Sequence, residues 1–110
     1  MIWLDNYAEY AENCGAMEIA GTLPRMKDNL SKDPIPHKEE IVNYLRAGTM
    51  NSATGAYITD FFTGELVLFP DHGRSDGVYR WGESLAYYVD RYNLKLPDAF
   101  VAHVLKQRKG

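Results

Sequence analysis

Apolar residues recur at helical spacing toward the end of the chain. One set occupies positions i, i+3, i+4 and i+7, the stripe with which a helix covers a sheet: Leu85, Tyr88, Val89 and Tyr92. This pattern predicts a helix with Gly82 as its N-cap and Asn93 in the left-handed conformation at its end. A last helix is predicted to open with Pro97, since proline suits a first helical position. Its apolar arc consists of Phe100, Val101, Val104 and Leu105.

Two further helices are predicted in the first half. The spacing of Trp3, Tyr7, Tyr10 and Cys14 defines one face of an amphipathic helix that closes at Gly15. The pattern weakens over residues 16–31, where Gly21 and Pro24 interrupt it. After the proline-rich stretch KDPIPH, acids in a first turn and Arg46 in a last turn predict a helix that ends at Gly48.

Period-two patterns predict the strands. AYITDFF and ELVLF are separated by Thr63 and Gly64, which is typical of a hairpin, and residues 78–81 form a short third strand. TMNSATG and DHGRSDG have the composition of loops. The expected fold class is α+β: one domain, residues 1–110, in which a small three-stranded antiparallel sheet packs against N-terminal and C-terminal helices.

Composition indicates the class of protein and the cellular compartment. The chain has 110 residues, 45% of them hydrophobic and 25% charged, as in an ordinary globular domain. A lone cysteine excludes an internal disulfide and favours a reducing, cytoplasmic compartment. The acidic N-terminus resembles neither a signal peptide nor a membrane span. Three scattered histidines have no zinc-ligand spacing, so neither a metal nor another cofactor is expected.

Charge argues against nucleic acid as a direct partner. The net charge is −3, and residues 1–24 contain four acids with no lysine or arginine. A second acidic excess runs over residues 56–79. Nucleic-acid binders normally present a basic footprint, whereas acidic patches steer basic proteins toward them. The partner class that suits this charge is a basic protein.

The segment from Asp71 to Asp76 contains the side-chain types of acid–base catalysis, including His72. Its glycine, aspartate and serine are also what turns use, so a solvated loop is the favoured interpretation. The alternative is a small hydrolase or ligand-binding enzyme that uses Asp71, His72 and Asp76. No G-x-S-x-G elbow and no glycine-rich phosphate loop is present in the sequence.

An aromatic series follows this loop and could serve as a stacking platform: Tyr79, Trp81, Tyr87, Tyr88 and Tyr92. Most of these rings lie on the predicted buried stripe or at a strand-to-helix corner, where large rings fill cores. Only Tyr87 falls off the stripe, and it is expected to be exposed. His103 borders the apolar arc of the last helix, where a histidine usually packs its ring and hydrogen-bonds one nitrogen.

Three motifs follow one another in the second half, T-G-E, D-G-x-Y-x-W and L-x-L-P-x-x-F-x-x-H, and the similarity around them extends over residues 41–105. In this order and spacing, the second half resembles the immunity proteins of bacterial polymorphic-toxin and contact-dependent growth inhibition systems. The resemblance implies an inhibitor, not an enzyme, that binds the C-terminal toxin domain of its own strain in the cytosol. Such toxins are commonly nucleases with basic surfaces.

The resemblance carries over no contact residue, because these proteins diverge at their contact surfaces. Candidates for partner binding rest on local charge alone: Asp5, Glu9 and Glu12 on the first helix, and Asp71, His72 and Asp76 in the loop. A third hypothesis is a scaffold or dimerisation module in which Trp3 and Tyr7 pack against another chain.

Overall fold

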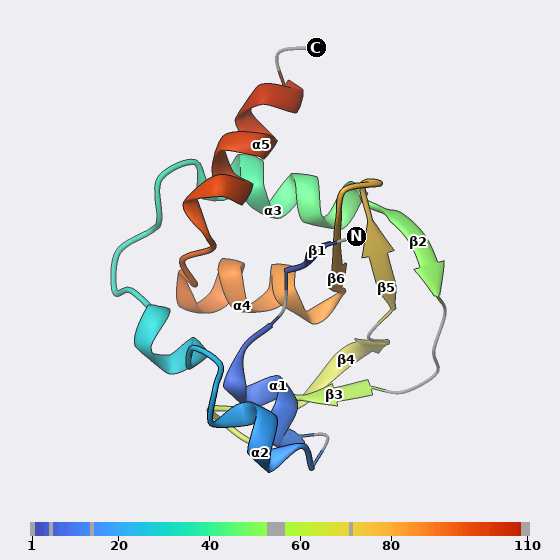
Figure 1. The fold of residues 1–110 in the computed structure, drawn as a ribbon. Coiled ribbons are helices and arrows are strands. Elements are labelled where there is room, and N and C mark those ends of the chain that lie inside the picture. The colour runs from blue at the N-terminus through green and yellow to red at the C-terminus, as the bar shows by residue number, and fades with distance from the viewer. Residues whose placement is uncertain (1, 5, 14, 53–56, 71, 109–110) are drawn as a thin grey trace.

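The computed structural model describes residues 2–4, 6–13, 15–52, 57–70 and 72–108. The fold is α+β, with the three longest helices on one side of a small sheet, and with a hairpin and the two short N-terminal helices below it in the view of Figure 1. In chain order, the elements are β1 Ile2–Trp3, α1 Ala8–Asn13, α2 Met17–Ala20, the 3₁₀ helix η1 Met26–Asn29, α3 Lys38–Ala47, β2 Thr49–Ser52, β3 Tyr57–Thr59, β4 Leu66–Pro70, β5 Gly73–Ser75, β6 Tyr79–Gly82, α4 Ser84–Tyr92 and α5 Asp98–Arg108.

The main sheet corrects the predicted three-stranded antiparallel arrangement. Among the described residues it has four strands in the order β1-β6-β5-β2, and it is mixed, because β1 runs parallel to β6 while the other neighbours are antiparallel. The predicted third strand is present as β6. Strand β5 beside it, and β2 beside β5, come from DHGRSDG and TMNSATG, which composition marked as loops. Short polar segments became strands because adjacent strands supply their hydrogen bonds.

The predicted hairpin is confirmed, although it stands outside the main sheet. Strands β3 and β4 pair antiparallel as a separate two-stranded sheet. Their connection is longer than Thr63 and Gly64 alone, since the Asp60 N–H donates to the Glu65 carbonyl at 2.8 Å. Gly64 has φ +76°, a conformation that glycine adopts without strain.

The N-terminal helix begins later than predicted. Ile2 and Trp3 form β1 beside β6, and α1 covers only Ala8–Asn13. Tyr7 is buried as expected, while the Trp3 side chain is 56% exposed and shares no face with it. Cys14 lies outside the described residues. The weak pattern after Gly15 resolves into the short helices α2 and η1, with Gly21 and Pro24 between them.

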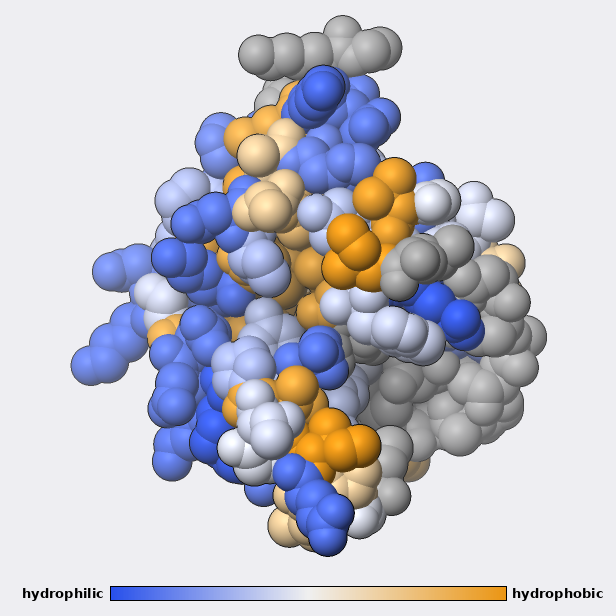
Figure 2. All heavy atoms as spheres, viewed as in Figure 1, coloured by the Kyte–Doolittle hydropathy of each residue, from blue (hydrophilic) through white to orange (hydrophobic). Residues whose placement is uncertain are grey.

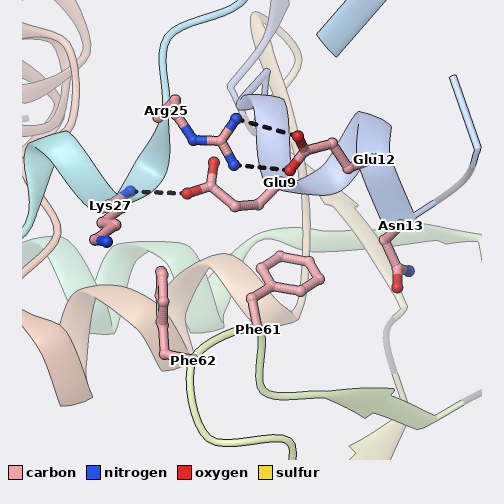
Figure 3. A pocket seen from close by; sticks show the side chains of 7 residues that line it. All are labelled: Glu9, Glu12, Asn13, Arg25, Lys27, Phe61 and Phe62. Atoms are coloured by element: carbon pink, nitrogen blue, oxygen red, sulfur yellow. Dashed lines mark hydrogen bonds and ion pairs between the residues drawn. The ribbon is translucent and has the colours of Figure 1, made fainter. Parts of the chain in front are cut away.

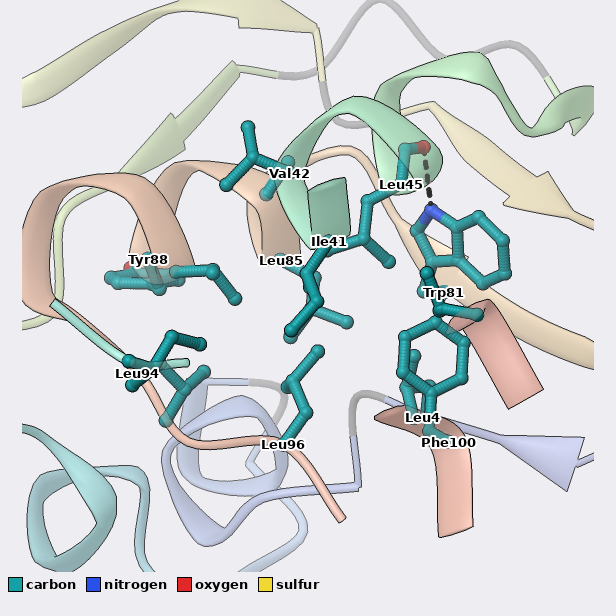
Figure 4. Packing of buried hydrophobic residues seen from close by; sticks show 14 of the residues in the cluster. Leu4, Ile41, Val42, Leu45, Trp81, Leu85, Tyr88, Leu94, Leu96 and Phe100 are labelled. Carbon is teal, nitrogen blue, oxygen red and sulfur yellow. Dashed lines mark hydrogen bonds between the residues drawn. The ribbon is translucent and has the colours of Figure 1, made fainter. Parts of the chain in front are cut away.

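Helices α3, α4 and α5 build the core against the inner face of the sheet, and α3 packs on both α4 and α5. Trp81 of β6 lies at the centre, as the strand-to-helix corner predicted, and its indole N–H donates to the Leu45 carbonyl at 3.0 Å (Figure 4). The predicted stripes of α4 and α5 face inward. The most buried side chains include Met26, Ile41, Leu45, Trp81, Leu85, Tyr88, Val89, Leu94, Leu96 and Phe100.

The ends of the last two helices follow the sequence closely. Asn93 adopts φ 56° after α4, and its N–H returns to the Val89 carbonyl. Helix α5 begins at Asp98, directly after Pro97, whose carbonyl accepts the Val101 N–H at 3.1 Å. The predicted N-cap of α4 is displaced by one residue, because Glu83 rather than Gly82 precedes the first helical residue. Among the described helices, none has the length and apolar character to cross a membrane.

Candidate functional site

Glu9, one of the candidates for partner binding, does not lie on an exposed face of the first helix. Its side chain is buried, and its two carboxylate oxygens accept the backbone N–H groups of Met26 at 2.7 Å and Lys27 at 2.9 Å. These are the first N–H groups of η1, which have no partner within so short a helix. Glu9 therefore fastens η1 to α1.

Glu12 lies one helical turn further along α1. Arg25 donates to both of its oxygens, at 2.8 Å and 3.1 Å, in a bidentate ion pair. The hydrogen bond from Arg25 lowers the pKa of the Glu12 carboxyl. Glu9 and Glu12 accept hydrogen bonds from η1 and from Arg25 just before it. At these two positions α1 therefore presents no uncompensated acidic stripe.

These acids line an open groove of about 720 Å³, here called the α1 groove (Figure 3). Its wall comes from α1 and from the segment that leads into η1, and aromatic rings of the β3–β4 turn lie across from them. The lining residues are Glu9, Glu12, Asn13, Arg25, Lys27, Phe61 and Phe62. Two acids and two bases make the groove neutral. Nothing in the sequence pattern connects Phe61 and Phe62 with α1, since only the tertiary fold brings them together.

Asp76 is the centre of a second polar assembly, the Asp76 cluster of Tyr44, Asp76 and His103. Oδ1 of Asp76 accepts the N–H groups of Val78 at 2.9 Å and Tyr79 at 2.7 Å, which shapes the turn between β5 and β6. Oδ2 accepts the Tyr44 hydroxyl and lies 2.7 Å from Nε2 of His103. One carboxylate thus joins the sheet to α3 and α5.

The surroundings of Asp76 stabilise its charge. Burial opposes ionisation, but hydrogen bonds from Tyr44, from the Tyr79 and Val78 N–H groups and from His103 outweigh it and lower the pKa of Asp76 to about 2. Burial, together with the hydrogen bond to Asp76, raises the pKa of Tyr44 above its ordinary value. Within the cluster, Asp76 is therefore held as a carboxylate beside the neutral Tyr44 phenol.

His103 matches its prediction, because its ring packs on Tyr79 with centroids 5.0 Å apart while Nε2 is hydrogen-bonded. His72 is partly buried. The histidine on Asp76 is His103, and the His72 carbonyl accepts the Glu83 N–H at 2.8 Å. The favoured interpretation as a solvated loop also needs correction, since Gly73–Ser75 form β5 and Asp76 is largely buried. Asp5 and Asp71 lie outside the described residues.

A third carboxylate, missed from the sequence, holds the β3–β4 turn to α4. Asp60 is 1% exposed, and it accepts the hydroxyls of Tyr87 and Tyr92 at 2.7 Å each. It also accepts the N–H groups of Phe62 and Thr63. Burial opposes the charge, and these hydrogen bonds together lower the pKa of Asp60. The prediction that Tyr87 is exposed is corrected, because this ring is partly buried against its neighbours.

Of the two aromatic residues in the dimerisation hypothesis, Trp3 is exposed and Tyr7 is buried. Tyr7 is 5% exposed and donates to the Lys95 carbonyl at 3.2 Å, so it belongs to the core. Trp3 remains on the surface beside other exposed apolar side chains. Figure 2 shows apolar surface in two places, beside the N-terminal strand and toward the end where α2 lies in Figure 1. The exposed large apolar residues include Ile2, Trp3, Met17, Ile19, Met50, Leu66 and Val78.

Within the described part of the chain, no three histidine, cysteine or acidic residues converge as metal ligands would. Glu9, Asp60 and Asp76 each accept hydrogen bonds from within the fold. Comparison with protein-family models, with curated proteins and with solved structures gave no match for this chain.

Proposed function

We propose that this protein binds and neutralises a bacterial toxin domain, as an immunity protein of a polymorphic-toxin or contact-dependent growth inhibition system. The proposal begins from the resemblance over residues 41–105. That segment supplies α3, both sheets beyond β1, α4 and most of α5, and therefore most of the core. The inhibitor would act in the cytosol by covering the toxin's active site or substrate entry.

One structural observation carries the proposal. The carboxylates that could do chemistry, Glu9, Asp60 and Asp76, each accept hydrogen bonds from inside the fold, while several large apolar side chains stay exposed. Saturated buried acceptors stabilise a structure, whereas exposed apolar side chains rimmed by polar ones mark protein contacts. This division favours a protein-binding function over turnover of a small molecule.

A basic partner is favoured by the net charge of the whole molecule rather than by single residues. Glu9 and Glu12 are committed to η1 and Arg25, and Asp76 is committed to its cluster. The net charge of −3 remains, and a field of this sign attracts a basic nuclease domain and speeds its association. Steering of this kind weakens as salt rises.

The test uses the product of the gene next to the one for this protein. We expect its C-terminal domain to be toxic when expressed alone, to lose toxicity when this protein is co-expressed, and to co-purify with it. The complex should associate more slowly at high salt in stopped-flow measurements. A neighbouring toxin that kills equally well in the presence of this folded protein would refute the proposal.

A matched pair of variants separates folding from contact. Glu9→Gln replaces a buried acceptor of two N–H groups and should reduce protection only through lower stability, which thermal unfolding reveals. Glu18→Gln changes an exposed carboxylate on α2, and its free energy of unfolding should stay within about 0.5 kcal/mol of the wild-type value. Any loss of protection by Glu18→Gln would therefore report on contact with the toxin.

A further inference from the structure

The outer edge of β1 offers unpaired main-chain groups. Ile2 N–H donates to the Val78 carbonyl at 2.9 Å, and Leu4 N–H donates to the Arg80 carbonyl at 2.8 Å. In a parallel pair the residues of one strand face its neighbour alternately, so the N–H and C=O of Trp3 point away from the sheet. No other described residue pairs with them, because β1 is the edge strand. An added strand could hydrogen-bond there.

The side chains around this edge are apolar and unusually exposed. Ile2, Trp3 and Val78 are 54%, 56% and 46% exposed. Trp3 is in register with Arg80, and Val78 precedes Arg80 by two residues, so these three side chains share the outer face of the sheet. Edges of natural sheets are normally shielded by charge, proline or a covering segment. On β1, the two large apolar side chains Ile2 and Trp3 take the place of such shielding groups.

Arg80 supplies the charge of this surface. Its guanidinium carbon lies 4.4 Å from the centroid of the Trp3 ring, in a cation–π contact. Its Nε is buried, with no hydrogen-bond partner among the described residues. A guanidinium normally pairs with a carboxylate or a carbonyl, and a planar fork favours a carboxylate. A partner that approaches from solvent can meet only the exposed part of this partly buried guanidinium, and the group that this part favours is an acid beside the Trp3 ring.

We infer that the β1 edge, formed by Ile2, Trp3, Val78 and Arg80, docks an extended segment of a partner protein that carries a carboxylate among apolar side chains. The outward N–H and C=O of Trp3 would pair with its backbone, the exposed apolar side chains would cover its apolar residues, and Arg80 would bind its acid. A second copy of this chain fits less well, since a twofold pairing of the described β1 residues would set apolar side chains against one another and bring no carboxylate to Arg80. The inference holds whether or not the partner is a toxin.

The test uses two cyclic β-hairpin peptides as probes, identical except for a central glutamate or lysine on a strand of alternating valine and threonine. Fluorescence reports the contact, because Trp3 is exposed whereas Trp81 is 1% exposed. We expect saturable binding of the glutamate hairpin, about tenfold tighter than the lysine hairpin, and slower hydrogen exchange of the Trp3 amide in the complex.

Variants of the full chain identify which residues contact the hairpin peptide. Trp3→Ala should weaken binding about tenfold, measured by titration calorimetry because this variant lacks the fluorescent reporter, and Arg80→Gln should abolish the preference for glutamate over lysine. Ile19→Ala is the matched control, because Ile19 is 58% exposed on α2, away from β1, and its binding should equal that of the wild type. Thermal unfolding of each variant identifies losses that come from instability.

Three results would overturn the inference. The first is the absence of saturable binding by wild-type protein, and the second is equal binding of the two hairpins. The third is a concentration-dependent dimer that protects the Trp3 amide and is lost in Trp3→Ala, which would make a second copy the occupant. None of these results bears on whether the protein neutralises a toxin, and the toxicity assay decides that question separately.

Discussion

At the scale of single residues, carboxylates account for most differences between sequence and structure. Glu9, Asp60 and Asp76 belong to segments whose composition suggests solvent, and each is instead enclosed and hydrogen-bonded. A carboxylate can be buried when several donors converge on it, and those donors come from residues 2 to 32 positions away. No local pattern records that convergence.

The lowered pKa of Asp76 predicts how the free energy of unfolding depends on pH. Its pKa in the folded protein is about 2, below the ordinary value of 3.8. A lowered pKa stabilises the fold above the ordinary value, and this contribution, about 2 kcal/mol, is lost as pH falls from about 4 toward 2. Asp76→Asn should therefore be less stable than wild type at pH 7 and should lose less stability over that window, as urea unfolding at each pH will measure.

The control for this prediction is Asp90→Asn, which alters a carboxylate on the surface of α4 whose contact with Arg46 is 3.7 Å long. Its pH profile should follow that of the wild type, since exposed pairs contribute little. If Asp76→Asn and the wild type show the same slope between pH 4 and 2, the Asp76 cluster does not contribute the expected stability.

At the scale of elements, helices with a regular apolar stripe were predicted well and short strands were not. Helices α3, α4 and α5 each carry their own stripe and end signals, so the local sequence contains the information. Strands β1, β2 and β5 have two to four residues, and they exist because β6 and its neighbours offer hydrogen bonds. Their sequences resemble turns or a helix start, which led to the errors.

The junction between α3 and β2 gives a prediction at this scale. A Cβ atom at Gly48 would lie 2.5 Å from Cζ2 of Trp81 and 3.3 Å from Cβ of Arg74. Gly48→Ala should therefore force the Trp81 ring from its place and reduce the free energy of unfolding by about 1–3 kcal/mol, measured by chemical denaturation. Near-ultraviolet circular dichroism should show the displaced indole.

Gly21→Ala is the matched control for Gly48→Ala. A Cβ there would meet only the Glu18 carbonyl oxygen at an ordinary 3.6 Å, and the backbone at Gly21 is right-handed helical. This variant should be neutral or slightly more stable, because alanine restricts the unfolded chain. Equal destabilisation by the two substitutions would mean that contact with Trp81 is not the cause.

At the scale of the whole molecule, two polar clusters connect elements that the hydrophobic core alone does not order. The Asp76 cluster joins α3, α5 and the β5–β6 turn. Asp60 joins the separate β3–β4 sheet to α4 through Tyr87 and Tyr92, and Phe62 packs on Tyr92 with ring centroids 5.0 Å apart. The hairpin keeps its position through this attachment, since a lone two-stranded sheet is marginally stable.

Asp60→Asn should therefore loosen the hairpin more than the rest of the fold. Removing a charged acceptor of four hydrogen bonds should cost about 2–3 kcal/mol, and amide exchange should rise in β3 and β4 before it rises in β5 and β6. Glu65→Gln is the control, because that side chain is 67% exposed and lies 3.9 Å from Arg91. Uniform loss of protection in Asp60→Asn would contradict a local attachment.

The sequence by itself determined the α+β class, the three stripe-bearing helices, the hairpin and the central position of Trp81. These follow from periodicity and end signals that lie within a few residues of one another. Only the tertiary structure decided the mixed order of the main sheet, the burial of Glu9 and Asp76, and the exposure of Trp3 on an open edge. Each of those depends on partners far apart in the chain, such as Tyr44, Asp76 and His103, whose meeting is set by packing rather than by local pattern.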